Sequence, residues 1–327
     1  MVYTYKLIFK SPLHIGNERS DYASGNSFIH SDTLYSAIAW AWNMLGKPEW
    51  IDHVPNEGIH LSSCFPFEQS RLFYPRPQFS YEINREILVE TSVKKKIKKA
   101  EWVDEKILTD ILSGREPIAN DKKNFSGGFW STDQFDKNDI IGRSVIPRVM
   151  VPRNNEDTKI YYIEKFFFKE DSGLYFIAKF KSEVEKKQLE SALKLLSEEG
   201  FGTDRNVGHG KFDFIVEQFE LPNIKPSSGL MYSLGLLIPK DRESMKQMMS
   251  HPQKGYGIMK RGGWLSEPYL TWKKRHVHMF TEGSVFKSLE DGNIVSNGRT
   301  VDLRPVDVKS TTSHPIWRCG RTLLLNF

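Results

Sequence analysis

A glycine-dense stretch, residues 200–212, most constrains how this chain can fold. Four of its thirteen residues are glycine, and it also holds the cationic residues Arg205 and Lys211. An amphipathic helical pattern precedes it over 183–199, and a strand pattern follows it over 212–219. Because glycine has no Cβ, such a loop lets backbone N–H groups approach a ligand closely. The cationic side chains indicate that this ligand is an anion.

The common nucleotide-binding motifs do not fit this stretch. A P-loop requires GxxxxGK followed by Ser or Thr, but position 205 is arginine and position 212 is phenylalanine. A dinucleotide fingerprint runs from a strand into a helix, whereas this stretch runs from a helix into a strand. Two readings stay open. The loop either follows a phosphate backbone, with Arg205, His209 and Lys211 supplying charge, or is a glycine-rich turn without a ligand.

The charge of the chain is unevenly distributed. Its net charge is +5 and its pI is near 8.9. Residues 223–327 hold 16 Lys and Arg against 8 Asp and Glu, a net charge of +8, whereas residues 1–222 carry −3. A basic second half favours a polyanionic partner such as nucleic acid, although basic domains without such a partner are common. The length of 327 residues is enough for two domains.

Cysteine, histidine and hydropathy patterns limit the chemistry and the location. Cys64 and Cys319 stand far apart without a CxxC pair, which excludes the usual zinc ribbons and argues against a disulfide framework. No HxxxH, HExxH or His/Asp cluster indicates a metal site, so no metal or cofactor is expected. The sequence shows neither a signal peptide nor a membrane span and predicts a cytoplasmic protein without a membrane partner.

The first 222 residues predict a β, α, β, β, α, β order, interrupted by an insertion. The expected strands are 2–9, 59–65, 71–74, 160–181 (two strands joined by a turn at 170–173) and 212–219. One helix opens near Ile29 with Ser31 or Asp32 as its N-cap and stops at Gly46, and the other covers 183–199. This is the ferredoxin-like order, in which two helices pack on one face of an antiparallel sheet.

Residues 75–157 are expected to be an insertion with its own hairpin or helical tip. Five lysines fall within positions 94–99, and they either grip phosphates or form a solvated face. Residues 223–327 predict a β-rich second domain. Its expected elements are strands at 230–238, 258–265, 277–280 and 322–327 and a short helix at 241–249.

Two histidines and two basic, aromatic segments are further candidates. His14 follows the first strand and His30 precedes the first helix, so either is a candidate general base for metal-free RNA cleavage or a capping or packing residue. Residues 260–264 and 272–278 interleave cations with aromatic rings. That composition suits single-stranded RNA, and it equally fits strands that alternate between core and surface.

Three motifs together resemble the RAMP superfamily of CRISPR proteins. They are Ser11–Pro–Leu–His–Ile–Gly16 after the first strand, Ile29–His–Ser–Asp–Thr–Leu–Tyr–Ser–Ala37 at the helix start, and GFGTDRNVGHGKF from Gly200. Within the superfamily the chain is similar to the Cas5-like subunit four of type III-A (Csm) effector complexes, and the similarity includes 280–285 and 314–321.

The resemblance implies an α+β fold of two ferredoxin-like (RRM-like) domains, residues 1–222 and 223–327, with a hairpin thumb inside the insertion at 75–157. It implies a non-catalytic RNA-binding subunit that holds the 5′ repeat-derived handle of the CRISPR RNA in an antiviral ribonucleoprotein. The implied partners are the CRISPR RNA, the large polymerase-like subunit, the backbone RAMP subunit and target RNA near the handle.

Two alternatives stay open: a metal-independent endoribonuclease that processes CRISPR RNA with His14 or His30 as base, and an RNA-binding module outside CRISPR. For the RNA-binding reading, the expected contacts come from the end of the first strand, the first helix start, the glycine stretch and the basic segment of the second half. They are His14, Gly16, Ser31, Gly200, Gly202, Thr203, Arg205, Asn206, Gly208, His209, Gly210, Lys211, Lys260 and Arg261.

Overall fold

The protein has a mixed α+β fold with several sheets, which confirms the α+β class predicted from the sequence. The computed structural model describes residues 1–18, 21–53, 58–81, 91–117, 124–151, 157–220, 222–224, 226–265, 269–305 and 314–327. Within these residues, no helix is both long enough and apolar enough to cross a membrane.

The first half of the chain is built around β1 (Val2–Phe9), which lies between β12 (Ser172–Phe180) and β13 (Phe212–Gln218). On its other edge β12 pairs with β4 (Ile59–Leu61) and β5 (Phe65–Glu68). All four pairings are antiparallel. With β4 and β5 counted as one interrupted strand along β12, these strands and two helices follow the expected β, α, β, β, α, β order along the chain.

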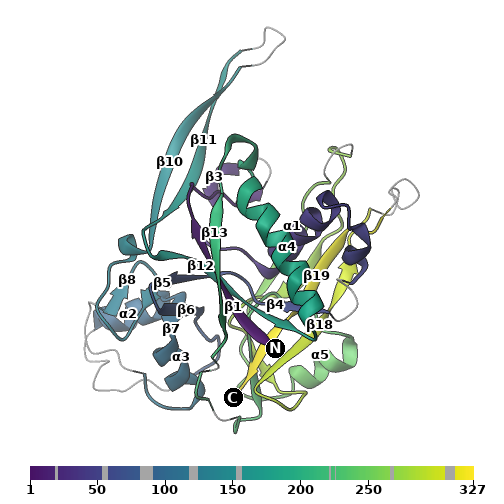
Figure 1. Cartoon of the computed structure of the whole chain (residues 1–327). Helices are drawn as coiled ribbons and strands as arrows, with labels where there is room; N and C mark the ends of the chain where they lie inside the picture. The colour runs from purple at the N-terminus through teal and green to yellow at the C-terminus, as the bar shows by residue number, and fades with distance from the viewer. Residues whose placement is uncertain are drawn as a thin grey trace.

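Helices α1 (Ser31–Met44) and α4 (Glu183–Glu199) pack against each other on one face of this sheet (Figure 1). The boundaries of α4 match the sequence prediction because local signals define them. A capping box starts the helix: the backbone N–H of Glu185 donates to the Ser182 hydroxyl, and that of Ser182 to the Glu185 carboxylate. Gly200, with a φ of +90°, ends it.

Most of the expected insertion continues the sheet instead of forming a separate tip. From β5 the strand order runs through β6 (Arg71–Pro75), β7 (Trp102–Asp104), β9 (Phe129–Trp130) and β8 (Phe125–Ser126). This part also holds α2 (Thr91–Lys99), α3 (Glu105–Leu112) and a 3-10 turn at Lys137–Asp139. Asp104 starts α3 as its N-cap and accepts a hydrogen bond from the Ile107 N–H.

A long antiparallel hairpin, β10 (Ile141–Met150) and β11 (Lys159–Phe168), projects from the body of the molecule (Figure 1). Two backbone hydrogen bonds between Leu13 and Phe166 fix its base. The turn signal at 170–173 predicted that the two strands within 160–181 pair with each other as a hairpin. This is wrong, because β11 pairs with β10 whereas β12 enters the central sheet, where nearly all of its residues are buried. The hairpin also extends beyond residue 157, the expected end of the insertion.

Residues 230–326 form a second antiparallel sheet in the order β17-β14-β19-β18. Its strands are β14 (Leu230–Ser233), β17 (Val285–Lys287), β18 (Ile294–Asp302) and β19 (Trp317–Asn326). The short helix α5 (Arg242–Met248) and a separate hairpin, β15 (Ile258–Arg261) with β16 (Val277–Phe280), accompany it. The sequence-based prediction did not include β17 or β18, nor the polar ribbon β2 (Gly16–Glu18) and β3 (Asp21–Gly25) or the 3-10 helix at Pro48–His53.

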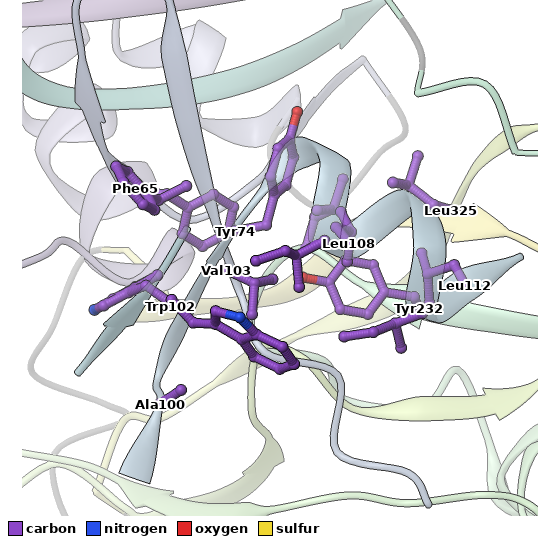
Figure 2. Packing of buried hydrophobic residues seen from close by; sticks show 14 of the residues in the cluster. Phe65, Tyr74, Ala100, Trp102, Val103, Leu108, Leu112, Tyr232 and Leu325 are labelled. Atoms are coloured by element: carbon purple, nitrogen blue, oxygen red, sulfur yellow. The ribbon is translucent and has the colours of Figure 1, made fainter. Parts of the chain in front are cut away.

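The two halves share one hydrophobic core. Figure 2 shows Phe65, Tyr74 and Val103 from the first half in one cluster with Tyr232 and Leu325 from the second. The Tyr232 hydroxyl also donates to the Pro75 carbonyl oxygen at 2.5 Å. The second sheet is therefore packed directly on the first part of the chain.

Candidate nucleic-acid interface

The glycines of residues 200–211, hereafter the glycine loop, mainly allow the protein's own backbone to approach. Gly200, Gly202, Gly208 and Gly210 all have φ between +73° and +99°, a region that favours glycine. A Cβ at Gly200, Gly202 or Gly210 would lie within 2.3 Å of a backbone carbonyl oxygen of the chain itself. A Cβ at Gly208 would meet nothing within 4 Å. The expected room for a ligand is thus filled by protein at three of the four glycines.

The outer side of the glycine loop carries side chains that RNA can reach. Thr203, Asn206 and Lys211 are exposed. Arg205 begins the 3-10 turn η5 (Arg205–Val207), and its guanidinium carbon lies 3.8 Å from the centre of the Trp40 ring of α1. This cation–π contact orients the guanidinium. The group keeps its positive charge, and the N–H donors at its edge can still form hydrogen bonds. Trp40 was not predictable as a partner of this loop, because its position in a helical pattern does not indicate a contact with a distant segment.

His14 lies beneath the glycine loop and supports it. The side chain is 1% exposed, its Nδ1 donates to the Glu164 carbonyl oxygen at 2.6 Å, and its own carbonyl accepts from the Thr203 N–H. Burial lowers the pKa of His14; Asp204 opposes this and Lys165 adds to it. The ring is therefore neutral at neutral pH and does not face the outer side of the loop.

Two cations of the hairpin complete the underside of the glycine loop. The Lys165 ammonium donates to Nε2 of His209 at 3.1 Å, and Nη2 of Arg148 lies 3.3 Å from the Asp204 carboxylate. Burial, and then Lys165, lower the pKa of His209, which keeps this ring neutral. Arg148 and Lys165 were not predicted as site residues, because a strand pattern does not indicate which loop the side chains of the strand will contact.

The start of α1 is buried and joins the two halves of the chain. Its N-cap is His30, without a side-chain capping bond, so the expectation of Ser31 or Asp32 as N-cap is wrong. Ser31 is fully buried: its N–H donates to the Ser63 hydroxyl at 2.8 Å and its hydroxyl accepts from the Leu236 N–H at 3.0 Å. Since both groups are engaged inside the protein, Ser31 is not an accessible RNA contact.

Asp32 binds two arginines of the second half. Nε and Nη2 of Arg261 lie 2.8 and 2.9 Å from its two carboxylate oxygens, and Nη1 of Arg318 lies 2.6 Å from one of them. Burial on its own would raise the pKa of Asp32, but the two guanidinium groups hold it at about 2. Arg261, an expected RNA contact, is engaged in this ion pair, whereas its neighbour Lys260 is exposed on β15.

His30 and Gly16 also lie away from the outer side of the loop. His30 is buried with Nδ1 2.8 Å from the Glu282 carboxylate, which also accepts from the Ser63 hydroxyl. Burial opposes ionisation of Glu282, but His30 and Ser63 outweigh it and lower the pKa of Glu282. Gly16 begins the ribbon β2–β3, which packs beside β11.

The lysine run and the tryptophan segments occupy separate surfaces. In α2, Val93 and Ile97 are buried one turn apart, while most of the lysines point to solvent. Trp264 and Trp272 are partly exposed beside β15–β16, and the Lys273 ammonium lies 4.8 Å from the Trp264 ring centre. Neither surface adds side chains to the glycine loop.

The accessible groups of the glycine loop are suited to binding an anionic chain. Cationic and hydrogen-bonding side chains of this kind contact phosphate and sugar groups without requiring a particular base. Within the described ranges, no group of three or more His, Cys, Asp and Glu residues is arranged to hold a metal ion.

Two family models match the chain, one for each half. The RAMP superfamily model matches residues 6–213, and that of the CRISPR Csm4 C-terminal domain matches residues 227–327. Two curated relatives are Csm4 proteins of CRISPR systems. The protein from Thermococcus onnurineus (strain NA1) is 23% identical over 79% of this chain and 81% of its own length. That from Methanocaldococcus jannaschii is 24% identical over 92% of this chain and 91% of its own length.

Solved structures share the fold of the whole chain. A chain in the crystal structure of the Csm3–Csm4 subcomplex of the type III-A CRISPR-Cas interference complex superposes with a TM-score of 0.65 and 20% identity, covering 100% of this chain and 99% of that one. A chain in the crystal structure of the Csm1–Csm4 cassette in complex with pppApA superposes with a TM-score of 0.59 and 19% sequence identity, covering 99% of this chain and 97% of that one. The resemblance read from the three sequence motifs is thus confirmed. The chain belongs to the RAMP superfamily, and its residues 227–327 match the CRISPR Csm4 C-terminal domain.

Proposed function

We propose that this chain is a non-catalytic subunit that holds the 5′ repeat-derived handle of the CRISPR RNA. The observation that carries the proposal is the outer side of the glycine loop, where Thr203, Arg205, Asn206 and Lys211 present donors and cations from one segment. The close backbone approaches at the glycines hold this segment in a defined shape. Cations on such a segment neutralise successive phosphates of a single strand. Gly208 and Lys260 are accessible and belong to the proposed contacts.

The proposed protein partners are the large polymerase-like subunit and the backbone RAMP subunit. Relatives with this fold have been crystallised in a Csm1–Csm4 cassette and a Csm3–Csm4 subcomplex. By contacting both subunits, the chain would connect the 5′ end of the guide RNA to the large subunit and to the backbone subunit. The assembled complex would act in antiviral defence. The projecting hairpin β10–β11 is proposed to be the thumb that contacts target RNA near the handle.

The proposed architecture is a pair of ferredoxin-like (RRM-like) domains, residues 1–222 and 223–327. In support, the first part has two helices on one face of an antiparallel sheet in the ferredoxin-like order. The second part has a four-stranded antiparallel sheet of its own, and a separate family model begins at residue 227.

An endoribonuclease role for His14 or His30 has less support. A general base must come within hydrogen-bond distance of the proton that it takes. His14 is enclosed beneath the glycine loop, and His30 is buried against Glu282. Neither ring reaches a 2′-hydroxyl on the outer side of the loop without a rearrangement of the protein.

The proposal predicts that Arg205→Ala and Lys211→Ala each weaken binding of full-chain protein to single-stranded handle RNA. Each change removes one phosphate contact, so the slope of log affinity against log salt becomes shallower by about 0.7. Fluorescence anisotropy over a salt series measures both quantities, with a scrambled RNA of equal length as competitor. Lys287→Ala is the matched control, because Lys287 is exposed on β17 of the second sheet.

Three outcomes would contradict the proposed function. Unchanged affinity and slope in both variants would remove the glycine loop from the interface. Equal binding of handle and scrambled RNA would favour a general RNA-binding module. Handle cleavage in EDTA that is lost in a His14→Ala or His30→Ala variant would favour the endoribonuclease.

A further inference from the structure

A cluster of charged groups lies beneath the glycine loop, and the contacts proposed on the outer side do not use it. Arg148 and Lys165 come from the hairpin, Asp204 and His209 from the loop, and His14 from the segment after β1. Arg148 contacts Asp204 at 3.3 Å, and Lys165 contacts His209 at 3.1 Å. Three segments far apart in sequence thus meet at one place.

Positive charge exceeds negative charge in this cluster. Among the described residues, Asp204 is the carboxylate whose charge acts on His14, Lys165 and His209. Lys165 is only 6% exposed, and burial together with the Arg148 guanidinium lowers its pKa. A single carboxylate therefore faces two cations and two histidines. A buried ammonium without full compensation favours the arrival of a further anion.

Glu164, which neighbours Lys165 on β11, does not provide a second negative charge to balance Arg148 and Lys165. Its carboxylate contacts the Arg143 guanidinium and accepts from the Gly25 N–H at 2.6 Å. Adjacent residues of a strand point to opposite faces, so these partners lie on the other side of β11 from His209.

His14 presents an unused polar atom beneath the loop. Its Nδ1 donates to the Glu164 carbonyl oxygen, and its Nε2 is buried without a hydrogen-bond partner among the described residues. A buried polar atom left unpaired costs about 1–3 kcal/mol. If the ring took up a proton, Nε2 would become a donor, which suits the arrival of an anion.

The Asp204 side chain can leave the cluster without unfolding the loop. Asp204 is the N-cap of η5 but makes no side-chain capping bond. The turn depends on its carbonyl oxygen, which accepts from the N–H groups of Val207 and His209. The side chains of Asp204 and Arg148 are 17% and 29% exposed, whereas Oδ2 of Asp204, which faces Arg148, is buried and accepts no hydrogen bond from the described residues.

We propose that Arg148 and Lys165 form a phosphate-binding site for the backbone of the bound RNA, which the Asp204 carboxylate occupies in the RNA-free protein. The site deepens the proposed function and rests on it. A phosphate diester presents one negative charge and two terminal oxygens to the planar guanidinium, as a carboxylate does. Before RNA binds, Asp204 pairs with Arg148 and its charge acts on Lys165; it lowers RNA affinity because it competes with the phosphate.

The test is Asp204→Asn, which removes the charge and keeps the side-chain shape. Full-chain protein carrying it should bind single-stranded handle RNA about tenfold more tightly, which corresponds to about 1.4 kcal/mol. The salt slope should become steeper by about 0.7, because one more phosphate is neutralised. Arg148→Gln should change both quantities in the opposite direction. In the double variant Asp204→Asn with Arg148→Gln, the gain in affinity should disappear.

The matched control is Asp213→Asn on β13, close after the loop, where the carboxylate forms an exposed ion pair with Lys10. An equal gain in affinity there would assign the effect to general electrostatics and overturn the proposal. Weaker or unchanged binding by Asp204→Asn would overturn it too and identify Asp204 as a structural tie between loop and hairpin. Thermal unfolding verifies that each variant is folded, and Arg148→Gln tests the site independently.

These results are distinguishable from failure of the proposed function itself. If handle RNA binds specifically and depends on Arg205 and Lys211 while Asp204→Asn changes nothing, only the inferred site is refuted. If the wild-type chain does not prefer handle RNA, the proposed function fails and the inferred site with it.

Discussion

At the start of α1, the Asp32 carboxylate is enclosed by the guanidinium groups of Arg261 and Arg318. Asp32→Asn would keep the shape of the side chain and leave two largely buried cations without their anion. Breaking a buried ion pair in this way destabilises a protein by about 3–5 kcal/mol. We expect a loss of that size in the free energy of unfolding of the full chain, measured by urea denaturation at pH 7.

The same change at an exposed ion pair provides the control. Asp213 lies 2.6 Å from the Lys10 ammonium, with both side chains largely in solvent. Such pairs contribute about 0–1 kcal/mol, so Asp213→Asn should lower stability little. Equal losses in the two variants would contradict a special role of Asp32 in joining the halves.

The role of Asp32 illustrates what a sequence does not reveal at the residue scale. The motif around Asp32 was recognisable in the sequence, but its partners Arg261 and Arg318 are 229 and 286 positions away. No local pattern encodes such a pairing, so Asp32 was read as a cap and Arg261 as an RNA contact. Local spacing is more informative about burial: Leu34 and Ile38, one turn apart on the same helix, are both buried.

At the scale of elements, the hairpin β10–β11 carries apolar side chains outside the core. Val149 and Ile160 pair across the two strands and are 56% and 65% exposed. Replacing both with threonine should change the stability of the chain by no more than about 0.5 kcal/mol, because the positions are exposed. If the hairpin is the thumb, a complex assembled with this variant should retain a smaller amount of complementary target RNA than the wild-type complex in a filter-binding assay. The amount of guide RNA that it retains should be unchanged.

Val184→Thr is the matched control for the hairpin, since Val184 is equally exposed but lies on α4. It should leave target retention at the wild-type level. Normal target retention by the hairpin variant would instead show that its apolar surface does not contact RNA.

Elements with local start and stop signals were predictable, and strand partners were not. The bounds of α4 follow from Ser182, Glu185 and Gly200, which act within a few residues. A strand pattern shows which face is buried but not which strand lies beside it. The pairing of β11 was therefore mistaken, and so the meeting of Lys165 with His209 beneath the loop could not be foreseen.

At the scale of the whole molecule, the two halves should unfold together. Residues of both contribute to one hydrophobic core, and the interface also contains buried polar contacts such as those of Asp32. One such contact joins His60 of β4 to Arg321 of β19, with 3.4 Å between the ring Nε2 and the guanidinium. Burial, and then Arg321, lower the pKa of His60 to about 3.

This buried histidine couples global stability to pH. An unfolded histidine binds a proton below about pH 6.5, whereas folded His60 does so only near pH 3, so stability falls as the pH decreases through this range. The free energy of unfolding should drop by about 2 kcal/mol between pH 7 and pH 5 from this group. His60→Gln should reduce that drop by about 2 kcal/mol, while His314→Gln, which removes an exposed histidine, should follow the wild-type profile. Tryptophan fluorescence and far-UV circular dichroism should give coincident denaturation curves at both pH values. Separate transitions, or a His60→Gln profile parallel to that of the wild type, would contradict the coupling.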